Sequence, residues 1–390
     1  MSSGVIRSEP NSRNGYIPTL DGWRALAVLG VVFYHATPMS AFGYSLANQG
    51  HRGVDIFFGI SGFLICSKLV SEESKRGKIN LKNFYLRRAF RILPAALIYL
   101  FVIAILGQTG VLTKMPFREL MSCIFFFRNY LPELSDITAY TGHYWSLSVE
   151  EHFYLIFPAL LMCGKARRLK YLAPLLALLI GCWRVLDTHY NISTSIFSPE
   201  VVLSYHRTDR QADSLLWGCT LALWVNQVAF RKLLDKKLNT SVWLILVAMY
   251  SASCFYRIPL QGTFEAILVP LLLYGTIANK NTLIGSIFEF PLLKWVGRLS
   301  YSIYLWHSIF FVGRYHQPAI LQAFPFNVIA LIICASASYY FIERPLIGFG
   351  HKLTKIDKSE LNPDDKVTEI IASQYTLYPP DGLATINQKR

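Results

Sequence analysis

Charged side chains are scarce in this sequence. Lysine, arginine, aspartate and glutamate together make up 16% of the residues, whereas about a quarter is usual for soluble domains. Apolar and aromatic residues make up 53%. This balance argues against an ordinary soluble domain and against a disordered chain, and it predicts a protein that crosses a membrane several times.

Patterns typical of metal sites and disulfide frameworks are also missing. The seven cysteines show no C-x-x-C spacing, and most of them lie inside apolar runs, namely Cys66, Cys163, Cys182, Cys219 and Cys334. No paired histidines accompany them. We therefore expect the cysteines to be small buried hydrophobic residues, and we expect neither a bound metal nor a disulfide.

Long apolar runs are abundant, and the run at 92–107 contains no charge at all. A helix needs about 20 mostly apolar residues to cross the roughly 30 Å hydrocarbon core of a bilayer. The runs predict an all-α polytopic membrane protein with about ten transmembrane helices. The predicted spans lie near residues 23–42, 53–70, 92–111, 144–163, 171–188, 210–227, 242–257, 262–279, 299–315 and 324–343.

The positive charges indicate how these spans are oriented. The formal net charge is +14, and the basic residues gather in three links between apolar runs, at 75–91, 165–170 and 231–238. The positive-inside rule assigns such links to the cytoplasm, and with about ten spans it assigns both termini there as well. Nucleic-acid binding requires a contiguous basic face, which the separated links do not form, so no nucleic-acid partner is expected.

The remaining links and the ends of the chain complete this topology. The links near 43–52, 112–143, 189–209 and 316–323 are expected on the opposite side of the membrane. The apolar content beyond residue 350 is too low to form a core. We expect a short cytoplasmic segment at 1–15, a membrane domain at 16–350 and a flexible polar tail at 351–390.

Ionisable residues inside the spans indicate a shared internal site, because each one is costly in hydrocarbon. In the stretch LDGWRALAVLGVVFYH, at residues 20–35, Arg24 and His35 are eleven residues apart. On a helix this spacing is about three turns, so both side chains lie on one stripe roughly 16 Å apart. Arg24 is therefore expected near the cytoplasmic boundary, and His35 deep inside.

His35 has a structural and a functional interpretation. A lone membrane histidine is commonly satisfied by one interhelical hydrogen bond. The shared stripe with Arg24 and the other buried charges favour function, since imidazole accepts a proton near neutral pH and a nearby carboxylate stabilises the imidazolium. Glu150 begins its span from the opposite boundary, and we expect it to approach His35.

Arg88 and Arg91, in the stretch LRRAFRILP, form a second polar feature. They are three residues apart, which puts them on one face of a helix at the cytoplasmic boundary. Ordinary membrane anchoring explains such a pair, and so does the binding of a phosphate-bearing cytosolic donor. Charge alone leaves both interpretations open.

Seven motifs follow one another through the membrane part of the chain. They are LDGWRALAVLGVVFYH with Arg24 and His35, GVDIFFGISGFLI, RRAFRILP with Arg88 and Arg91, GHYWSLSVEEHFYLIFP with Trp145 and Glu150, RTDRQADSLLWG with Arg210 and Asp213, LSYSIYLWHSIFF with His307, and FIERPL with Glu343 and Pro345. In this order they resemble acyltransferase family 3, a family of polytopic acyl-CoA-dependent transferases. The match at Arg210 and Asp213 is approximate.

The resemblance implies a ten-helix domain that takes an acyl group, most often acetyl, from coenzyme A in the cytoplasm and passes it to a hydroxyl group. Acceptors in the family include bacterial surface polysaccharides, lipopolysaccharide, peptidoglycan and macrolide antibiotics. We expect an acetyl-CoA-dependent O-acetyltransferase of the bacterial cytoplasmic (inner) membrane that modifies a surface polysaccharide, lipopolysaccharide or lipid-linked sugar. A small-molecule acceptor such as a macrolide stays open. Some members carry a fused SGNH-type esterase domain, and a stand-alone transferase is expected here.

The same resemblance implies roles for the motif residues. His35 takes the proton of the acceptor hydroxyl, Glu150 supports the charged imidazole, and Arg24 helps to hold the donor. Arg88 and Arg91 bind the phosphates of coenzyme A. The residues expected to bind substrate are Trp145, Arg210, Asp213 and His307.

A membrane transporter is the alternative from a different class. Buried histidine, glutamate and arginine suit a proton relay as well as catalysis. Against this, the sequence has no apparent inverted repeat, and the paired arginines fit a bulky phosphate-bearing donor. The acyltransferase is therefore the favoured interpretation.

Overall fold

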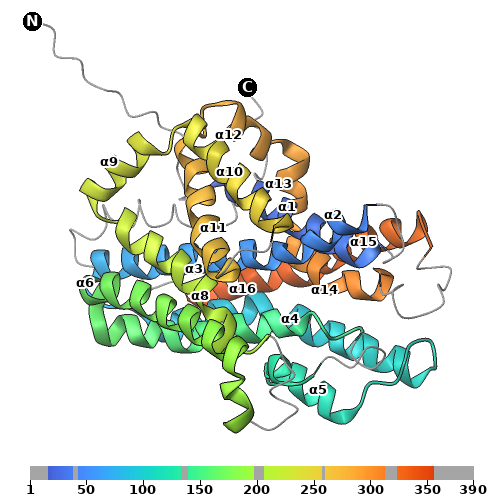
Figure 1. Cartoon of the computed structure of the whole chain (residues 1–390). Helices are drawn as coiled ribbons and strands as arrows, with labels where there is room; N and C mark the ends of the chain where they lie inside the picture. Colours follow the sequence, from blue (N-terminus) through green and yellow to red (C-terminus); the bar gives the residue numbers. More distant parts are fainter. Residues whose placement is uncertain are drawn as a thin grey trace, which may run out of the picture. The chain divides into compact units, whose positions relative to one another are not determined.

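The fold is helical in the part of the chain that the structure describes. The computed structural model describes residues 16–37, 43–132, 139–196, 206–256, 260–311 and 323–354, except for the side chains of 165–167. Within these ranges every regular element is a helix, and no strand is present (Figure 1). The predicted all-α fold class is therefore confirmed.

Long helices alternate with short ones along the chain, and Thr19–Thr354 form one compact unit. The first half contains α1 (Pro18–Ala36), α2 (Tyr44–Asn48), η1 (Gln49–Arg52), α3 (Gly53–Arg76), α4 (Leu81–Gln108), α5 (Phe117–Ile124), η2 (Arg128–Tyr130), α6 (Tyr144–Tyr190) and η3 (Ile192–Ser195). The second half contains α8 (Thr208–Val225), α9 (Val228–Lys237), α10 (Thr240–Phe255), α11 (Gln261–Ala278), α12 (Leu283–Phe288), α13 (Pro291–Arg298), α14 (Ser300–Phe311), α15 (Phe326–Ala337), the π-helical η5 (Ser338–Glu343) and α16 (Arg344–Leu353).

Five helical segments of the described chain are long and apolar enough to cross a membrane, judged by length and composition. They are Tyr44–Arg76, Leu81–Gln108, Arg168–Tyr190, Gln261–Ala278 and Phe326–Leu353. The helices α9 and α10, which are bent by 82° at their junction, add a sixth if the pair counts as one broken span. Such segments are typical of a multi-pass membrane protein.

The predicted count of ten spans is not confirmed, because several predicted spans coincide with helices that are shorter or more polar than this standard. The described part of α14 has 12 residues, which is about 18 Å of helix. The helix α8 begins with Asp209, Arg210 and Asp213 in its first two turns. Such charges lower the mean hydropathy of α8. A helix can carry them because its protein neighbours, rather than lipid, surround them.

The segment at 165–170, predicted as a loop between two spans, is helical instead. The structure has one continuous helix, α6, from Tyr144 to Tyr190. Lysine, alanine, arginine and leucine, which make up this segment, are all strong helix formers, so nothing in the local sequence ends the helix there. The helix as a whole is not straight, because Trp145 and Arg184, 39 positions apart in it, line the same cavity. The predicted spans at 144–163 and 171–188 are therefore two arms of α6 that return to the same level, and Arg168–Tyr190 by itself is long and apolar enough to cross a membrane.

Three helices, α3, α6 and α8, form the packed centre of the molecule. In Figure 1, α3 runs between α10 and α11 on one side and α4 and α6 on the other. Glycine allows α3 and α8 to touch backbone to backbone: a Cβ atom added to Gly62 would lie 2.0 Å from the carbonyl oxygen of Leu215, and one added to Gly218 would lie 2.5 Å from that of Gly59. Small residues permit such close approach between helices in membranes.

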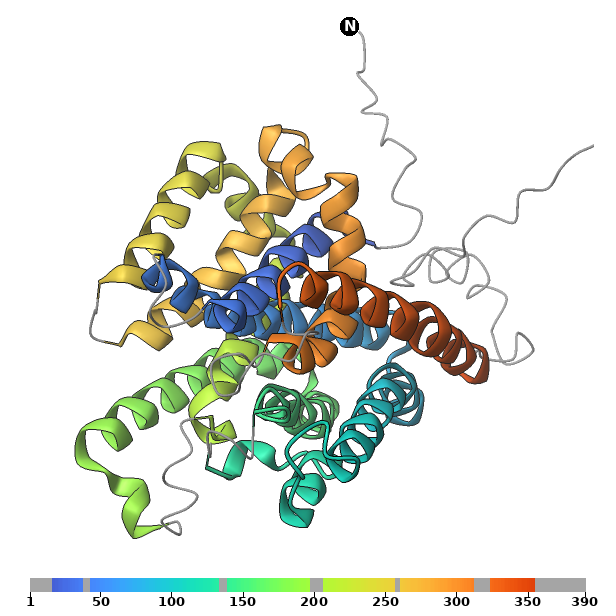
Figure 2. The ribbon, with the colours of Figure 1, turned by 90° about the vertical axis from the view of Figure 1, so that its right-hand side faces the viewer.

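The helix α1 crosses the start of α3 in the opposite direction. Gly50 faces Gly30 and Tyr34, and Gly53, three residues further, faces Ala27. The end of α1 therefore lies beside the beginning of α3, and the beginning of α1 lies beside later turns of α3. Figure 2 shows α16 running beside α4, which brings the last described helix to the group that contains Arg88 and Arg91.

Candidate active site

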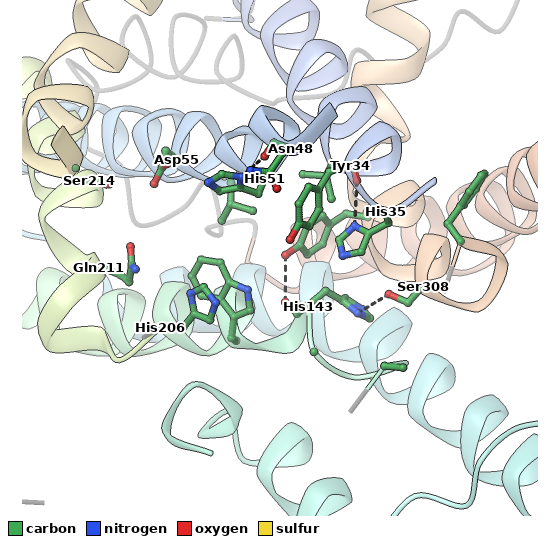
Figure 3. Close-up of a pocket in the computed structure, with 18 of the residues that line it drawn as sticks. Tyr34, His35, Asn48, His51, Asp55, His143, His206, Gln211, Ser214 and Ser308 are labelled. Carbon is green, nitrogen blue, oxygen red and sulfur yellow. Dashed lines mark hydrogen bonds between the residues drawn. The ribbon is translucent and has the colours of Figure 1, made fainter. Parts of the chain in front are cut away.

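A cavity of about 630 Å³ opens among α1, α3, α6, α8 and α14. One end is lined by His35, His143 and Ser308, and the other by Asp55, Gln211 and Ser214, with His206 between them (Figure 3). Tyr304 contacts His143, and Trp145 stacks on His206; both also line the cavity. His35 is thus at the cavity predicted from its place in the first span. Since a ligand pocket typically measures about 300–1,000 Å³, this cavity has room for a sugar-sized molecule.

His35 stands in the last turn of α1 and is half-buried. Its Nδ1 atom lies 3.0 Å from the carbonyl oxygen of Val31, one turn earlier (Figure 3). Because a carbonyl oxygen only accepts, Nδ1 carries the hydrogen and donates it. In the neutral ring the basic nitrogen is then Nε2, so the backbone of α1 prepares His35 to take up a proton.

Two further histidines surround His35. The ring of His307, on α14, lies 4.8 Å from that of His35, centroid to centroid, and the ring of His143 lies 5.4 Å from that of His307. His307 is fully buried and donates from Nδ1 to the carbonyl oxygen of Tyr304. Its Nε2 therefore bears the lone pair of the neutral ring, and this atom has no hydrogen-bond partner in the described part of the protein.

His143 and Ser308 form a hydrogen-bonded pair in the wall of the cavity. The Ser308 Oγ atom lies 2.8 Å from Nδ1 of His143 (Figure 3). His143 immediately precedes α6, and Ser308 follows His307 on α14. The hydroxyl of Tyr304 donates to the carbonyl oxygen of His143 at 3.1 Å, so α14 holds this residue from two sides.

Trp145 lies along the middle of the cavity, where the ring of His206 stacks on it at 3.9 Å between centroids and 14° between planes. Flat aromatic faces beside polar groups are a common way to bind a sugar ring, because they bury its C–H faces while the hydroxyls find hydrogen bonds. The carboxylate of Asp55 and the hydroxyl of Ser214 lie at the far end (Figure 3). The position of Trp145 fits its predicted role in binding substrate.

A group of cations lies away from the cavity. Lys68, on α3, is exposed and lies within electrostatic range of Arg24, Arg87, Arg88 and Arg91. Among the described residues, neither Lys68 nor Arg88 has an ion pair. Positive charges this close together repel one another unless an anion offsets them. We call Arg24, Lys68, Arg87, Arg88 and Arg91 the donor cluster. Their shared positive charge makes this cluster suited to binding phosphate.

Two of these arginines are held by neighbouring side chains. Arg24 pairs with Asp21 at 3.0 Å, one turn earlier on α1. The guanidinium of Arg88 lies over the ring of Tyr154 on α6, 4.6 Å from its centroid. Such cation–π contact holds the side chain while leaving its N–H groups available to an anion.

The cavity and the donor cluster are two levels of the same helices. On α3, Asp55 lines the cavity and Lys68 joins the cluster; the two residues are thirteen positions apart, which is about 20 Å of helix. On α1, which runs the other way, His35 lines the cavity and Arg24 joins the cluster. Both α1 and α3 therefore present one end to the polar cavity and the other to the cations.

Comparison with known proteins identifies the family of the chain. The model of acyltransferase family 3, described as an acyltransferase domain, matches residues 17–342. The chain belongs to acyltransferase family 3. No solved structure matches it.

Two similar proteins are O-acetyltransferases by name. The peptidoglycan O-acetyltransferase OatA of Listeria monocytogenes is 30% identical over 357 residues, which cover 85% of this chain and 56% of the relative. The O-acetyltransferase OatA of Staphylococcus aureus (strain NCTC 8325) is 29% identical over 360 residues, which cover 86% of this chain and 58% of the relative. The chain thus spans less than two thirds of the length of these relatives.

Glu150, which the family motif puts in the Trp-Ser-Leu-x-x-Glu segment, lies between the two levels and does not line the cavity. It accepts a hydrogen bond of 2.7 Å from Ser61 on α3. Its electrostatic neighbours include Arg88 and Arg91. The structure thus brings Glu150 to the arginines of the donor cluster, while its predicted support of His35 stays a prediction.

Arg210 and Asp213, the approximate match to the family, belong to an ion-pair network and do not line the cavity themselves, although Arg184, the partner of Asp213, does. Both carboxylate oxygens of Asp213 are held by Arg184 on α6, at 2.7 and 2.8 Å. Arg210 pairs with Asp187 at 3.1 Å. These contacts join α6 to α8, and they fit a structural role better than the predicted role in binding substrate.

The same network contains Arg207, which the sequence motifs did not single out. It is fully buried and pairs with Asp187 at 2.9 Å and Asp209 at 3.0 Å. Burial opposes its charge, but the hydrogen bonds and charges of Asp209 and Asp187 hold the pKa of Arg207 above its ordinary value. Arg207 therefore stays charged at physiological pH.

His307 is likewise outside the cavity lining, since its ring packs against His35 instead. Its position is better suited to contact with the base, His35, than to contact with the substrate. The sequence analysis also missed His143 and Ser308, although each stands beside a residue that the motifs contain: His143 precedes Trp145 by two positions, and Ser308 follows His307. Proximity along the chain was the available signal.

Within the described residues, no three histidine, cysteine, aspartate or glutamate side chains are arranged to hold a metal ion. The group of His35, His143 and His307 is therefore better understood as a set of proton acceptors. Histidine serves this purpose because its unperturbed pKa lies near neutrality.

Proposed function

We propose that the protein is an acetyl-CoA-dependent O-acetyltransferase that takes its donor from the cytoplasm and its acceptor from the opposite side of the membrane. The acceptor is a hydroxyl group of a surface polysaccharide, lipopolysaccharide or lipid-linked sugar. The protein acts in the bacterial cytoplasmic membrane, with about ten spans and both termini in the cytoplasm. The observation that carries this proposal is the separation of cations and cavity into two levels.

The donor binds at the cationic level. Coenzyme A carries several phosphate charges, and Lys68, Arg88 and Arg91 offer the N–H donors that phosphate oxygens accept. Arg24, the member of this cluster on α1, lies about three turns from His35. It guides the thioester end of the donor, and the long pantetheine arm bridges the distance to the cavity.

The acceptor binds in the cavity, where Trp145 and its stacked partner His206 form an aromatic wall. The hydroxyl that becomes acetylated lies at the end lined by His35. Nε2 of His35 takes the hydroxyl proton as the oxygen attacks the thioester carbonyl, and coenzyme A leaves as the thiol. Burial among three helices limits competing hydrolysis by water.

Glu150 has a place in this scheme that differs from the one expected from the sequence. A carboxylate beside Arg88 and Arg91 offsets part of their mutual repulsion and fixes their positions. The ring beside the protonated His35 is that of His307, and its Nε2 lone pair has no hydrogen-bond partner among the described residues.

The test uses purified protein in nanodiscs with radiolabelled acetyl-CoA. Peptidoglycan glycan strands are the first acceptor, because the Listeria monocytogenes relative is named for peptidoglycan, and lipopolysaccharide and a lipid-linked sugar follow. Release of coenzyme A that depends on the acceptor, together with an acetyl ester on the glycan, supports the proposal. Gradient-driven solute uptake with no binding of coenzyme A would favour a transporter instead.

Donor binding is tested separately by the affinity for coenzyme A. Lys68→Gln and Arg88→Gln each remove one charge from the cluster and should weaken binding by about 10- to 100-fold, since a hydrogen bond to a charged group contributes about 1.5–3 kcal/mol. Lys82→Gln is the matched control, because Lys82 is an exposed lysine in the first turn of α4. Equal affinity in all four proteins would reduce the cluster to membrane anchoring.

A further inference from the structure

The cavity contains a second base, His143, that direct transfer to an acceptor does not use. Its Nδ1 atom is bonded to the hydroxyl of Ser308 at 2.8 Å, and both side chains line the cavity. The two residues come from different helices, so their pairing is a product of tertiary packing. A serine hydroxyl hydrogen-bonded to an imidazole is the arrangement that activates a nucleophile.

The hydrogen bond allows transfer of the serine proton to the ring in one of the two neutral tautomers of His143. With Ser308 donating, Nδ1 of His143 accepts and Nε2 carries the ring hydrogen. The ring is kept in this orientation by edge-to-face contacts with Tyr99 and Tyr304, at 5.4 and 5.6 Å between centroids. The backbone of His143 is held as well, because its carbonyl accepts from the Tyr304 hydroxyl.

The pair is also in the right place for the acyl group. Ser308 follows His307 on α14, and His307 packs against His35, the base of the proposed function. His35 and His143 are also in electrostatic contact with each other. An acyl group delivered to His35 is therefore delivered to the end of the cavity where the serine stands (Figure 3).

The two-level arrangement gives a reason for a covalent stage. Donor and acceptor arrive from opposite ends, yet both reacting groups meet in a cavity of about 630 Å³. If the acyl group first moves to the protein, coenzyme A withdraws before the acceptor enters. One small cavity then serves both substrates in turn.

We propose that Ser308 is the nucleophile that carries the acyl group, activated by His143, and that transfer proceeds through an acyl-Ser308 ester. In the first step the hydroxyl proton of Ser308 passes to Nδ1 of His143 while Oγ attacks the thioester carbonyl. The C–S bond breaks, and the sulfur leaves as coenzyme A thiol with the proton from His143. This inference rests on the proposed function.

The second step restores the serine. The acceptor hydroxyl loses its proton to His35 and attacks the carbonyl carbon of the acyl-Ser308 ester. The C–Oγ bond breaks, and the proton returns to Oγ of Ser308. The products are the acetylated acceptor and the free enzyme, so the two steps together transfer one acyl group and leave no net charge.

The decisive experiment needs no acceptor. A covalent intermediate allows radiolabelled coenzyme A to exchange into acetyl-CoA when no acceptor is present, whereas direct transfer does not. In nanodiscs, the wild-type protein should catalyse this exchange, and Ser308→Ala should abolish it. His143→Gln should slow it by about 10²- to 10⁴-fold, which is the usual contribution of a general base.

Labelling of the protein identifies the attachment site. After incubation with radiolabelled acetyl-CoA, the acetyl group should be found on the α14 peptide that contains Ser308. A serine ester survives neutral hydroxylamine, whereas an acyl-cysteine or an acyl-histidine does not. Ser308→Cys should keep the exchange and convert the label into a form that neutral hydroxylamine removes. Ser300→Ala, on the same helix, is the control and should behave as the wild type.

The outcomes separate this inference from the function on which it rests. Wild-type transfer to an acceptor without exchange, or with the acetyl group on any other residue, would overturn the acyl-Ser308 ester and leave the transferase intact. Normal exchange in a folded Ser308→Ala variant would do the same. Failure of the wild-type protein to bind coenzyme A at all would overturn both.

Discussion

At the scale of single residues, the hydrogen bond from Nδ1 of His35 to the carbonyl of Val31 decides which ring nitrogen is basic. The bond lies within one turn of α1, so it forms wherever that turn is helical. No other residue is then needed to fix the tautomer of the His35 ring. The basic nitrogen of His35 is therefore determined within α1, whereas the surroundings of the ring are determined by α14.

His35→Gln tests the base and keeps a side chain of similar size. Acetyl transfer should fall by about 10²- to 10⁴-fold because the proton acceptor is lost, while the affinity for coenzyme A should change little, since His35 is distant from the donor cluster. Rates with the acceptor and binding of coenzyme A are measured on the same preparation. Transfer at a near-normal rate would remove His35 from the mechanism.

Glu150→Gln distinguishes two roles for this carboxylate. If Glu150 positions Arg88 and Arg91, the loss of its charge should chiefly weaken the binding of coenzyme A. If it supports His35, turnover should fall by orders of magnitude with donor affinity unchanged. Combination with His35→Gln gives a second readout: effects on the rate that multiply indicate separate roles, and non-additive effects indicate one catalytic unit.

At the scale of elements, the contact between α3 and α8 depends on glycine. In Gly218→Ala the new methyl group would lie 2.5 Å from Gly59 O and 2.9 Å from Phe63 N, both backbone atoms that cannot move aside alone. We expect a loss of about 1–3 kcal/mol in stability, as for other overpacked sites. The thermal unfolding temperature in detergent reports it.

Gly348→Ala, on α16, is the control for that substitution. An added Cβ there meets no atom within 4 Å, and alanine favours a helix over glycine by roughly 1 kcal/mol. This variant should be as stable as the wild type or slightly more so. Equal destabilisation of both variants would mean that α3 and α8 are not closely packed.

The pair formed by Arg184 and Asp213 is the second contact between elements. Asp213 is fully buried, so Asp213→Asn leaves the guanidinium of Arg184 without its counter-charge. Loss of one partner of a buried ion pair costs about 3–5 kcal/mol, which should appear as a lower unfolding temperature. An unchanged unfolding temperature with weaker acceptor binding would return Asp213 to the substrate role predicted from the sequence.

At the scale of the whole molecule, the two levels predict that donor and acceptor use opposite faces of the membrane. In inside-out vesicles, acetyl-CoA added outside reaches the donor cluster, and acetylation should proceed. In right-side-out vesicles the same addition should give none, because coenzyme A thioesters do not cross the bilayer. Permeabilisation should equalise the two. Transfer in intact right-side-out vesicles would contradict the proposed sidedness.

The sequence determined a good deal by itself. Scarcity of charge and long apolar runs predicted an all-helical membrane protein, and the eleven-residue spacing put Arg24 and His35 on one helix, as the structure confirms. Arg88 and Arg91 likewise share α4. The ordered motifs identified the family. All of these follow from composition or from the period of a single helix, which are local properties.

The sequence predicted helix boundaries less well, and the reason is also a local property of the chain. The basic segment at 165–170 carries charges typical of a loop but residues that favour a helix, and the helix continues. Charge predicted which side of a membrane the segment faces, and backbone propensity decided its conformation. The two signals answer different questions.

Only the tertiary structure decided which residues meet. Glu150 belongs beside Ser61 and the arginines, Asp213 belongs to Arg184, and Ser308 reaches His143 across 165 positions of the chain. Such pairings depend on the rotation and register of neighbouring helices, which close contacts such as that of Gly218 with Gly59 fix. A helical period tells which side chains share a face, but it carries no information on the partner helix that the face meets.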